Sequence, residues 1–431
     1  MKKMTYTMLS ILFIFTGCGA VGTEKIEKMM LFYPSAISEP IVNITPIFTP
    51  PTTLESSPLP TRTFEAALFK AMPADRNYMI SPLSLRMALA MAANGAEGLS
   101  RQELLAALDI DDLNAFNQWA ANFIAYFNAN EEMELNIANS VWLNEDLFDC
   151  ICLDFSNTYR QIISRYFNGA ARTINAQNGV DIINAWVSEQ TRDRINDIIR
   201  EDIFDEESEI LALLINAVYF KGGWLMPFNS DLTRDGIFTN RTGYESVIPF
   251  MYQTAWFAYY ENDYFKMLAK PYEDLSIRMY FVLPKTTEIL SFNMFEKAIP
   301  NMTRENVALR LPRFQTESFH DNLVEILKNM GVNRAFEERH YDFVGYNNMI
   351  YSPNLPIWVW IADVYQKTFI EVDELGTEAA AVTVVEMAAA TMIPPPPIPF
   401  YCDRPFIYFI RSDTTGDVLF MGEFAFVESV D

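Results

Sequence analysis

The sequence has very few histidines and few basic residues. Only His320 and His340 are histidines among 431 residues, which leaves little material for histidine-based metal clusters or general-base catalysis. Lysine and arginine together number 32 against 56 for aspartate and glutamate, giving a formal net charge of −24 at pH 7. Such an acidic surface repels nucleic-acid phosphates and anionic lipid head groups. These shortages argue against most enzyme classes, against nucleic-acid binding and against electrostatic docking on membranes.

Apolar residues, by contrast, are plentiful. Half of the chain is hydrophobic and 14% is aromatic, which is enough to bury a large core. We find no internal repeat after Arg62 and no second linker rich in Pro, Gly or Ser, so we expect residues 62–431 to form one domain. Residues 34–60 contain seven prolines. Proline fixes φ and lacks an N–H donor, so this stretch predicts an extended tether in front of the domain.

The first residues are typical of an export signal. Two lysines precede a short apolar run, residues 8–15, which is too short to cross a bilayer as a helix. Small residues then stand directly before Cys18, which resembles the signal of bacterial lipoproteins. That resemblance implies that residues 1–17 are a signal peptide and that Cys18 carries the lipid of a tether, residues 18–61. We therefore expect an exported lipoprotein anchored to the cell envelope, with plain secretion as the alternative.

The other cysteines do not form a disulfide framework. With Cys18 assigned to the anchor, Cys150, Cys152 and Cys402 remain, and an odd number cannot all pair. Cys150 and Cys152 have no second cysteine pair or nearby histidine to complete four metal ligands. We expect no metal site and no cofactor.

Helical and strand patterns are interleaved along the body. Apolar spacings of three and four predict helices, and continuously apolar runs predict strands buried at the centre of a sheet. Their order is not a regular βαβ alternation, so the predicted fold class is α+β. The predicted helices cover residues 64–71, 84–92, 98–108 and 180–199, and the predicted strands cover residues 135–143, 210–220, 275–283, 308–314, 357–372, 406–410 and 418–426.

Residues 372–400 carry an unusual alternation. Odd positions from Thr377 to Ala389 hold small, β-branched or apolar side chains, whereas Glu378 and Glu386 lie at even positions. In a strand, one face would therefore be small and uncharged and the other would accept charge. The prolines that follow, beginning at Pro394, cannot join a central ladder. The segment predicts a latent strand, although an Ala-rich helix or a loop would also fit it taken alone.

Seven segments of the body, in this order, are similar to the serpin family. They are residues 77–84, 136–139, 183–187, 215–224, 311–314, 376–381 and 403–406. The resemblance implies three β-sheets, eight or nine helices and an exposed reactive loop. It also implies a suicide-substrate inhibitor: a target protease cleaves the loop and is acylated by it, and the freed loop inserts as a new strand of the main sheet.

The resemblance assigns roles to individual residues. Counting from Gly376 places the reactive bond between Ala390 and Thr391, and the small residues before it favour elastase-like or subtilisin-like targets. Glu374 is expected to pair with Arg313, and Thr377 to insert first. The loop hinge comprises Glu374, Gly376, Thr377, Glu378, Ala379, Ala380, Ala381 and Val382. The region where the sheet opens comprises Ser81, Ser84, Asn216, Trp224, Arg313 and Gln366.

The expected partner is therefore a serine protease, or a cysteine protease, held in a 1:1 covalent complex by a monomeric chain that is not itself an enzyme. One alternative is a non-inhibitory serpin that acts as a binding or chaperone-like protein. Another is an enzyme with Ser81 or Ser84 as nucleophile, but neither lies in a nucleophile-elbow pattern. Both histidines fall in a segment that predicts surface helix and loop.

Gln366 is a departure from the family. It stands just before Lys367, where members of the family usually carry a histidine. Glutamine can donate and accept hydrogen bonds but does not titrate near neutral pH. We therefore expect loop insertion to depend little on pH between about 5.5 and 7.5.

Overall fold

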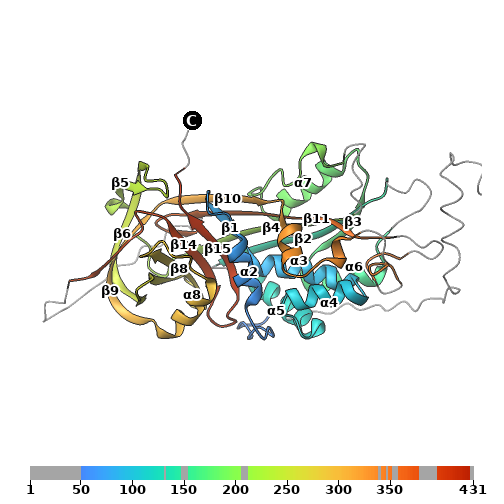
Figure 1. Cartoon of the computed structure of the whole chain (residues 1–431), viewed down its shortest axis with the longest axis horizontal. Helices are drawn as coiled ribbons and strands as arrows, with labels where there is room; N and C mark the ends of the chain where they lie inside the picture. Colours follow the sequence, from blue (N-terminus) through green and yellow to red (C-terminus); the bar gives the residue numbers. More distant parts are fainter. Residues whose placement is uncertain are drawn as a thin grey trace, which may run out of the picture.

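The structure is a computed structural model that describes residues 50–130, 133–146, 154–204, 212–337, 341–345, 348–351, 358–377 and 396–427 (Figure 1). The predicted signal peptide, Cys18, and Cys150 and Cys152 lie outside these residues. In the described ranges, no helix is both long enough and apolar enough to span a membrane.

The main sheet has six strands in the order β10-β11-β12-β4-β2-β3. Its two central strands, β11 and β4, run parallel and pair from Ile361 to Phe369 of β11. All but one residue of β4 is buried, as its continuously apolar sequence predicts. The strands are β2 (Met133–Asn144), β3 (Ala170–Ile174), β4 (Ala212–Gly223), β10 (Phe314–His320), β11 (Ile361–Val372) and β12 (Gly376–Thr377).

The second sheet has nine strands, with β5 pairing onto β6 outside the path β1-β15-β14-β8-β7-β6-β9-β13. The 17-residue strand β6 pairs with β5, β9 and β7 in turn. These pairings join strands into one hydrogen-bonded sheet, whereas the expected three-sheet fold divides them between two sheets. The strands are β1 (Tyr78–Ile80), β5 (Arg234–Thr239), β6 (Glu245–Glu261), β7 (Phe265–Pro271), β8 (Ile277–Pro284), β9 (Thr303–Pro312), β13 (Ile398–Tyr401), β14 (Phe406–Ser412) and β15 (Val418–Phe424).

Eight α-helices occur in the described parts of the chain, and with the two sheets they confirm the α+β class. They are α2 (Thr63–Ala71), α3 (Pro82–Gly95), α4 (Gly98–Ala107), α5 (Leu113–Ala129), α6 (Asn157–Phe167), α7 (Gly179–Gln190), α8 (Phe292–Ala298) and α9 (Leu323–Asn329). Short 3₁₀ helices are η1 (Glu201–Phe204), η2 (Ser230–Leu232), η3 (Ile299–Asn301) and η4 (Arg334–Phe336).

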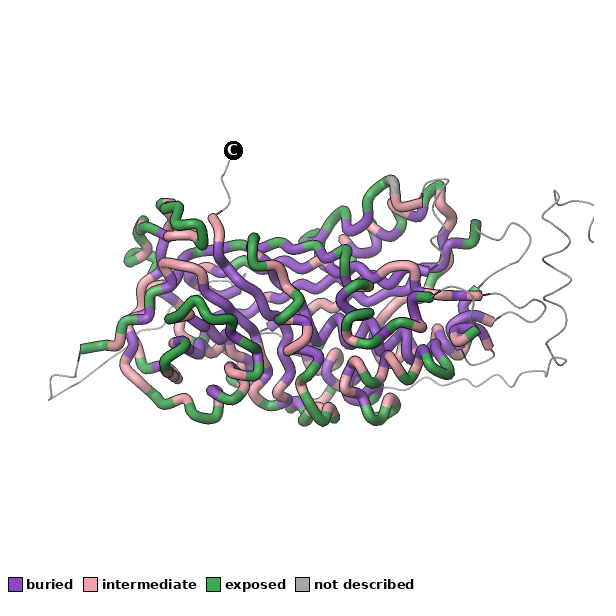
Figure 2. The backbone as a smooth tube through the Cα atoms, in the orientation of Figure 1, coloured by how far each residue is buried: buried purple, intermediate pink, exposed green. Residues whose placement is uncertain are grey.

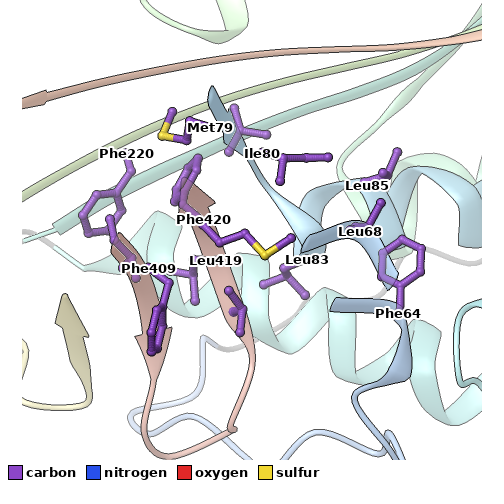
Figure 3. Packing of buried hydrophobic residues seen from close by; sticks show 14 of the residues in the cluster. Phe64, Leu68, Met79, Ile80, Leu83, Leu85, Phe220, Phe409, Leu419 and Phe420 are labelled. Carbon is purple, nitrogen blue, oxygen red and sulfur yellow. The ribbon is translucent and has the colours of Figure 1, made fainter. Parts of the chain in front are cut away.

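The main sheet is covered on both faces. In Figure 1, α7 lies on one side of it and α3 to α6 lie on the other. On the α7 side, Trp142 of β2 packs edge-on against Trp186 of α7. On the other side, every residue of α3 is buried, and the large core runs from this helix to the second sheet (Figures 2 and 3). Ser81 caps α3 by accepting the N–H of Ser84, which fixes the start of the helix beneath β4 and β11.

Residues 50–61 contact the body although their prolines predict a tether. Leu54 is buried, and the Trp119 indole of α5 donates a hydrogen bond to the Glu55 carbonyl over 3.2 Å. Thr61 donates to Asp109 over 2.7 Å. Proline content favours extended chain but does not distinguish a free tether from an extended segment lying on a surface. Contacts with the body therefore extend upstream of Arg62.

Candidate functional site

The hinge turn begins where β11 ends. The Asp373 carboxylate accepts the N–H groups of Leu375 (2.8 Å) and Gly376 (3.0 Å), and the Asp373 N–H donates to the Gly376 carbonyl over 3.0 Å. The chain thereby reverses, and β12 enters between β11 and β4. Thr377 pairs with Val372 of β11 on one side and with Gly222 of β4 on the other. Two residues of the hinge, Gly376 and Thr377, thus already form a short strand of the main sheet.

Glu374 is held by partners from two other elements. Arg313 Nε lies 2.8 Å from both carboxylate oxygens, and Thr233 donates to the same carboxylate. Burial alone would raise the pKa of Glu374, but the hydrogen bonds from Arg313 and Thr233 outweigh it and hold that pKa below its ordinary value. The expected pair of Glu374 and Arg313 is present, whereas Thr233 was not predicted.

Thr377 is completely buried, and its hydroxyl lies 2.9 Å from the Tyr272 hydroxyl. The Tyr272 ring is stacked on Trp224 with centroids 4.6 Å apart. The Trp224 indole donates to the Asp373 carbonyl over 3.0 Å, so neighbouring rings contact both ends of the hinge turn. Sequence reasoning named Trp224 but missed Tyr272.

Lys270 lies next to the Trp224 ring and is buried, and within the described residues it forms no ion pair with a carboxylate. Its ammonium donates to the Met226 carbonyl (2.7 Å) and to Gln253 Oε1 (2.6 Å), and it lies 4.3 Å from the Phe228 ring centroid. Burial holds its pKa well below the ordinary value for lysine. The aromatic rings next to the hinge turn, Trp224 among them, therefore pack against a buried lysine side chain.

Below the hinge, a buried polar cluster joins β11, β4 and the start of α3. The Ser81 N–H donates to Gln366 Oε1 over 2.8 Å, and Gln366 Nε2 donates to the Ser81 carbonyl over 3.1 Å and to Asn216 Oδ1. Asn216 donates in turn to Ser84 Oγ and Asn139 Oδ1. The structure brings the predicted residues Ser81, Ser84, Asn216 and Gln366 together. Asn139 was not assigned to the site, although the similar segment 136–139 contains it.

His320 is buried, and the prediction of a surface position was wrong. It ends β10, where side chains alternate inward and outward from Phe314 onward. Its Nε2 lies 2.8 Å from the Met79 carbonyl, and its strand partner on β11 is Gln366. Burial lowers the pKa of His320. Period-two alternation through Phe314, Thr316 and Ser318 was the signal that could have placed it.

Several predicted site residues lie outside the described residues. They are Glu378, Ala379, Ala380, Ala381, Val382, Ala390, Thr391 and His340. Within the described ranges, no group of three His, Cys, Asp or Glu side chains is arranged to hold a metal ion. Cys402 is a free, buried thiol, and burial raises its pKa.

Comparison with known proteins agrees with this geometry. Residues 60–426 match the family model described as Serpin (serine protease inhibitor). An uncharacterized serpin-like protein of Thermococcus kodakarensis is 33% identical over 375 residues, covering 83% of both chains. The native structure of the thermophilic serpin Tengpin is 30% identical, covers 84% of this chain and 92% of that one, and superposes with a TM-score of 0.74. Human thyroxine-binding globulin is 22% identical, covers 84% and 95% of the respective chains, and has a TM-score of 0.71; this likeness concerns the fold alone.

Proposed function

The chain belongs to the serpin family, and we propose that it inhibits serine proteases by inserting its cleaved reactive loop into the main sheet. The observation that carries this proposal is the position of Gly376 and Thr377 between β11 and β4. A loop that continued in the same direction would part these two strands and pair with both. Non-inhibitory members share the fold, so the fold alone does not decide between the two kinds of serpin.

The sequence of the loop supports the same proposal. After Thr377 the inward positions carry small, β-branched or, at Met387, unbranched apolar side chains, which can enter a packed sheet without overfilling it. Glu378 and Glu386 fall on the opposite face. Each residue that inserts adds ladder hydrogen bonds worth about 0.5–1.5 kcal/mol net, besides the burial of its inward side chain.

We propose the following covalent step. The serine Oγ of the target protease attacks the carbonyl carbon of Ala390, the C–N bond to Thr391 breaks, and the new amino group of Thr391 takes up the proton lost by the serine. Ala390 remains attached to the protease as an ester. Inhibition results when loop insertion is faster than hydrolysis of this ester by water. Ala390 and its apolar neighbours fit shallow pockets, so we expect elastase-like and subtilisin-like targets.

We also propose that the chain works outside the cytoplasm as a monomer. Support comes from the export-type segment that ends at Cys18. Either Cys18 carries a lipid that anchors the chain, or the chain is secreted without an anchor. Binding one protease molecule through one loop requires no second copy of the chain.

The test is capture of a protease on a denaturing gel. The full chain is incubated with elastase-like, subtilisin-like, trypsin-like and papain-like proteases. We expect an SDS-resistant 1:1 band with the elastase-like or subtilisin-like members, and no band when their catalytic serine is replaced by alanine. Loop cleavage without any such band across the panel would favour the non-inhibitory alternative.

A further inference from the structure

We propose that Tyr272 is a positioning residue that holds the hinge inside the main sheet before any protease arrives, through its hydrogen bond to Thr377. This inference rests on the proposed inhibitory function and identifies the contact that sets the resting position of the reactive loop. It concerns a residue that follows β7 and belongs to the second sheet's connections, not to the main sheet itself.

The hydrogen bond between the two hydroxyls is enclosed. Tyr272 and Thr377 are both completely buried, and their oxygens lie 2.9 Å apart. The Tyr272 hydroxyl also lies 3.6 Å from Met279 Sδ, so it can donate to sulfur while accepting from Thr377. Removing either hydroxyl would leave the other buried without its oxygen partner. The free-energy cost of such an unpaired buried group exceeds the stability that an exposed hydrogen bond contributes.

The Tyr272 ring is fixed by aromatic neighbours. It stacks on Trp224 at an interplanar angle of 17° and meets Phe220 edge-on at 77°. Trp224 in turn bonds the Asp373 carbonyl at the other end of the hinge turn. A ring held on two sides presents its hydroxyl in one direction, so the contact with Thr377 is preorganised.

A glycine pair at the end of β4 makes room for this arrangement. Gly222 and Gly223 are the strand partners of Thr377 and Gly376. A Cβ on Gly222 would lie 3.1 Å from Tyr272 Cδ1, and one on Gly223 would lie 2.8 Å from the Glu273 carboxyl group. A side chain at position 222 would therefore press on the fixed Tyr272 ring, whereas the flexible Glu273 side chain could move away from one at position 223.

Holding Thr377 in place gives loop insertion a ready starting point. The first residues of a strand lose conformational freedom before neighbouring pairs compensate for that loss. With the hinge already paired, the cleaved loop only has to extend an existing strand. Because insertion competes with ester hydrolysis, loss of the hydrogen bond would let more target protease escape and more inhibitor be consumed as substrate.

The experiment compares five variants of the full chain. Tyr272→Phe and Thr377→Val each remove one hydroxyl, the double variant removes both, and Thr377→Ser keeps the hydroxyl. Tyr159→Phe is the matched control, because its buried hydroxyl donates to the Met91 carbonyl over 3.2 Å, and Met91 and Tyr159 lie on α3 and α6, outside the hinge turn. Two quantities are measured: hydrogen exchange of the backbone amides in residues 373–377 of the uncleaved chain, and the fraction of chain cleaved without capturing an elastase-like protease.

We expect Tyr272→Phe and Thr377→Val to speed hinge exchange at least fivefold and to raise the uncaptured fraction, with the double variant no worse than Thr377→Val. Thr377→Ser and Tyr159→Phe should match the parent chain. The proposal is overturned if Tyr272→Phe leaves hinge exchange unchanged, or if the two single effects add in full. The exchange measurement needs no protease, so it can succeed or fail independently of the proposed inhibition.

Discussion

Gln366 makes three hydrogen bonds at a position where serpins usually carry a histidine. Its amide oxygen accepts from the Ser81 N–H, and its amide nitrogen donates to the Ser81 carbonyl and to Asn216. A neutral imidazole offers one donor and one acceptor, so it could not serve all three partners. The Gln366 side chain therefore connects β11, β4 and the start of α3 through more hydrogen bonds than a neutral histidine could make there.

His320 restores a titratable group to the same region. The expectation of pH-independent behaviour rested on Gln366, but His320 lies beside it on β10 and is buried. Burial is the largest cause that lowers its pKa, Arg76 lowers it further, and the Met79 hydrogen bond and Asp321 act in the opposite direction. The native chain thus binds this proton less readily than the unfolded chain, whose histidine titrates near pH 6.5.

We predict that the contribution of His320 to the free energy of unfolding has its full value above about pH 7 and decreases as the pH falls through about 6.5. Urea unfolding between pH 5 and 8 measures this for the parent chain and for His320→Gln. Burial also raises the pKa of three carboxyl groups, those of Glu296, Asp417 and Glu423. Their effect on stability is opposite, because the native state binds these protons more readily than the unfolded chain as the pH falls. These contributions cancel in the difference between the two chains. A difference that stayed constant across this range would contradict the prediction.

If the chain inhibits proteases as proposed, we predict that Thr377→Arg turns it into a substrate. Thr377 is completely buried against Tyr272, so an arginine there must either bury an unpaired charge or leave the sheet. Expulsion of the hinge slows insertion, and the ester is hydrolysed first. Gels should show loop-cleaved chain and free, active protease without a covalent band. Thr377→Ser is the control, and undiminished complex in Thr377→Arg would disprove the assigned role of this position.

At the scale of elements, apolar periodicity located three of the six main-sheet strands, β2, β4 and β11, and the helices α2, α3 and α4. It failed where the chain turns without a change of composition: the helix predicted over residues 180–199 ends at Gln190, and Arg192 and Asp193 then have positive φ. The 17-residue β6 was missed because its burial alternates irregularly among aromatic and polar residues. Motif similarity supplied Ser81, Asn216 and Gln366, and the period-two alternation of β10 could have placed His320. Tyr272 and Thr233 depend on contacts between distant segments, which no local pattern encodes.

Asn216 connects the two strands that loop insertion must separate. It accepts from Gln366 on β11 and donates to Asn139 on β2 and to Ser84 on α3. We predict that Asn216→Ala lowers the free energy of unfolding by about 2 kcal/mol or more, because several buried polar groups lose partners together. It should also speed conversion of the uncleaved chain to a loop-inserted form, since β4 and β11 part more easily.

Urea unfolding and native gels over time measure these two effects. Gln118→Ala on the exposed face of α5 is the control and should change neither. An unchanged unfolding midpoint in Asn216→Ala, or slower conversion, would contradict the prediction.

For the molecule as a whole, not all of the acidic charge lies at the surface. Arg86 and Glu65, both fully buried, form a two-pronged ion pair of 2.7 and 3.0 Å that joins α3 to α2. Arg62 pairs with the buried Asp417 over 2.7 Å at the turn between β14 and β15. Because breaking one partner of a buried pair leaves an uncompensated charge, these contacts hold the N-terminal end of the body firmly to its core.

The register of the hinge also fixes how far an inserted loop would extend. Thr377 pairs with Gly222, so continuing in register would bring Glu378 opposite Lys221 and Met387 opposite Ala212, the first residue of β4. Ala390 would then lie just beyond the end of that strand. At roughly 3.3 Å per residue, an attached protease would be carried about 43 Å from the hinge, across the whole sheet.

We therefore predict that the target cuts between Ala390 and Thr391. A cut several residues earlier would stop the protease part-way along β4. A cut several residues later would leave Pro394 and the following prolines beyond the end of β4, where they cannot add ladder pairs. The C-terminal peptide released on complex formation should begin at Thr391, as intact-mass measurement of the denatured complex would show. Replacing Ala390 by Arg should shift inhibition from elastase-like to trypsin-like proteases without moving the cut, because an acidic specificity pocket needs a basic side chain. A released peptide that begins after Arg or Lys in the parent chain, or preferential capture of trypsin by the parent, would contradict both the bond and the register from which it is counted.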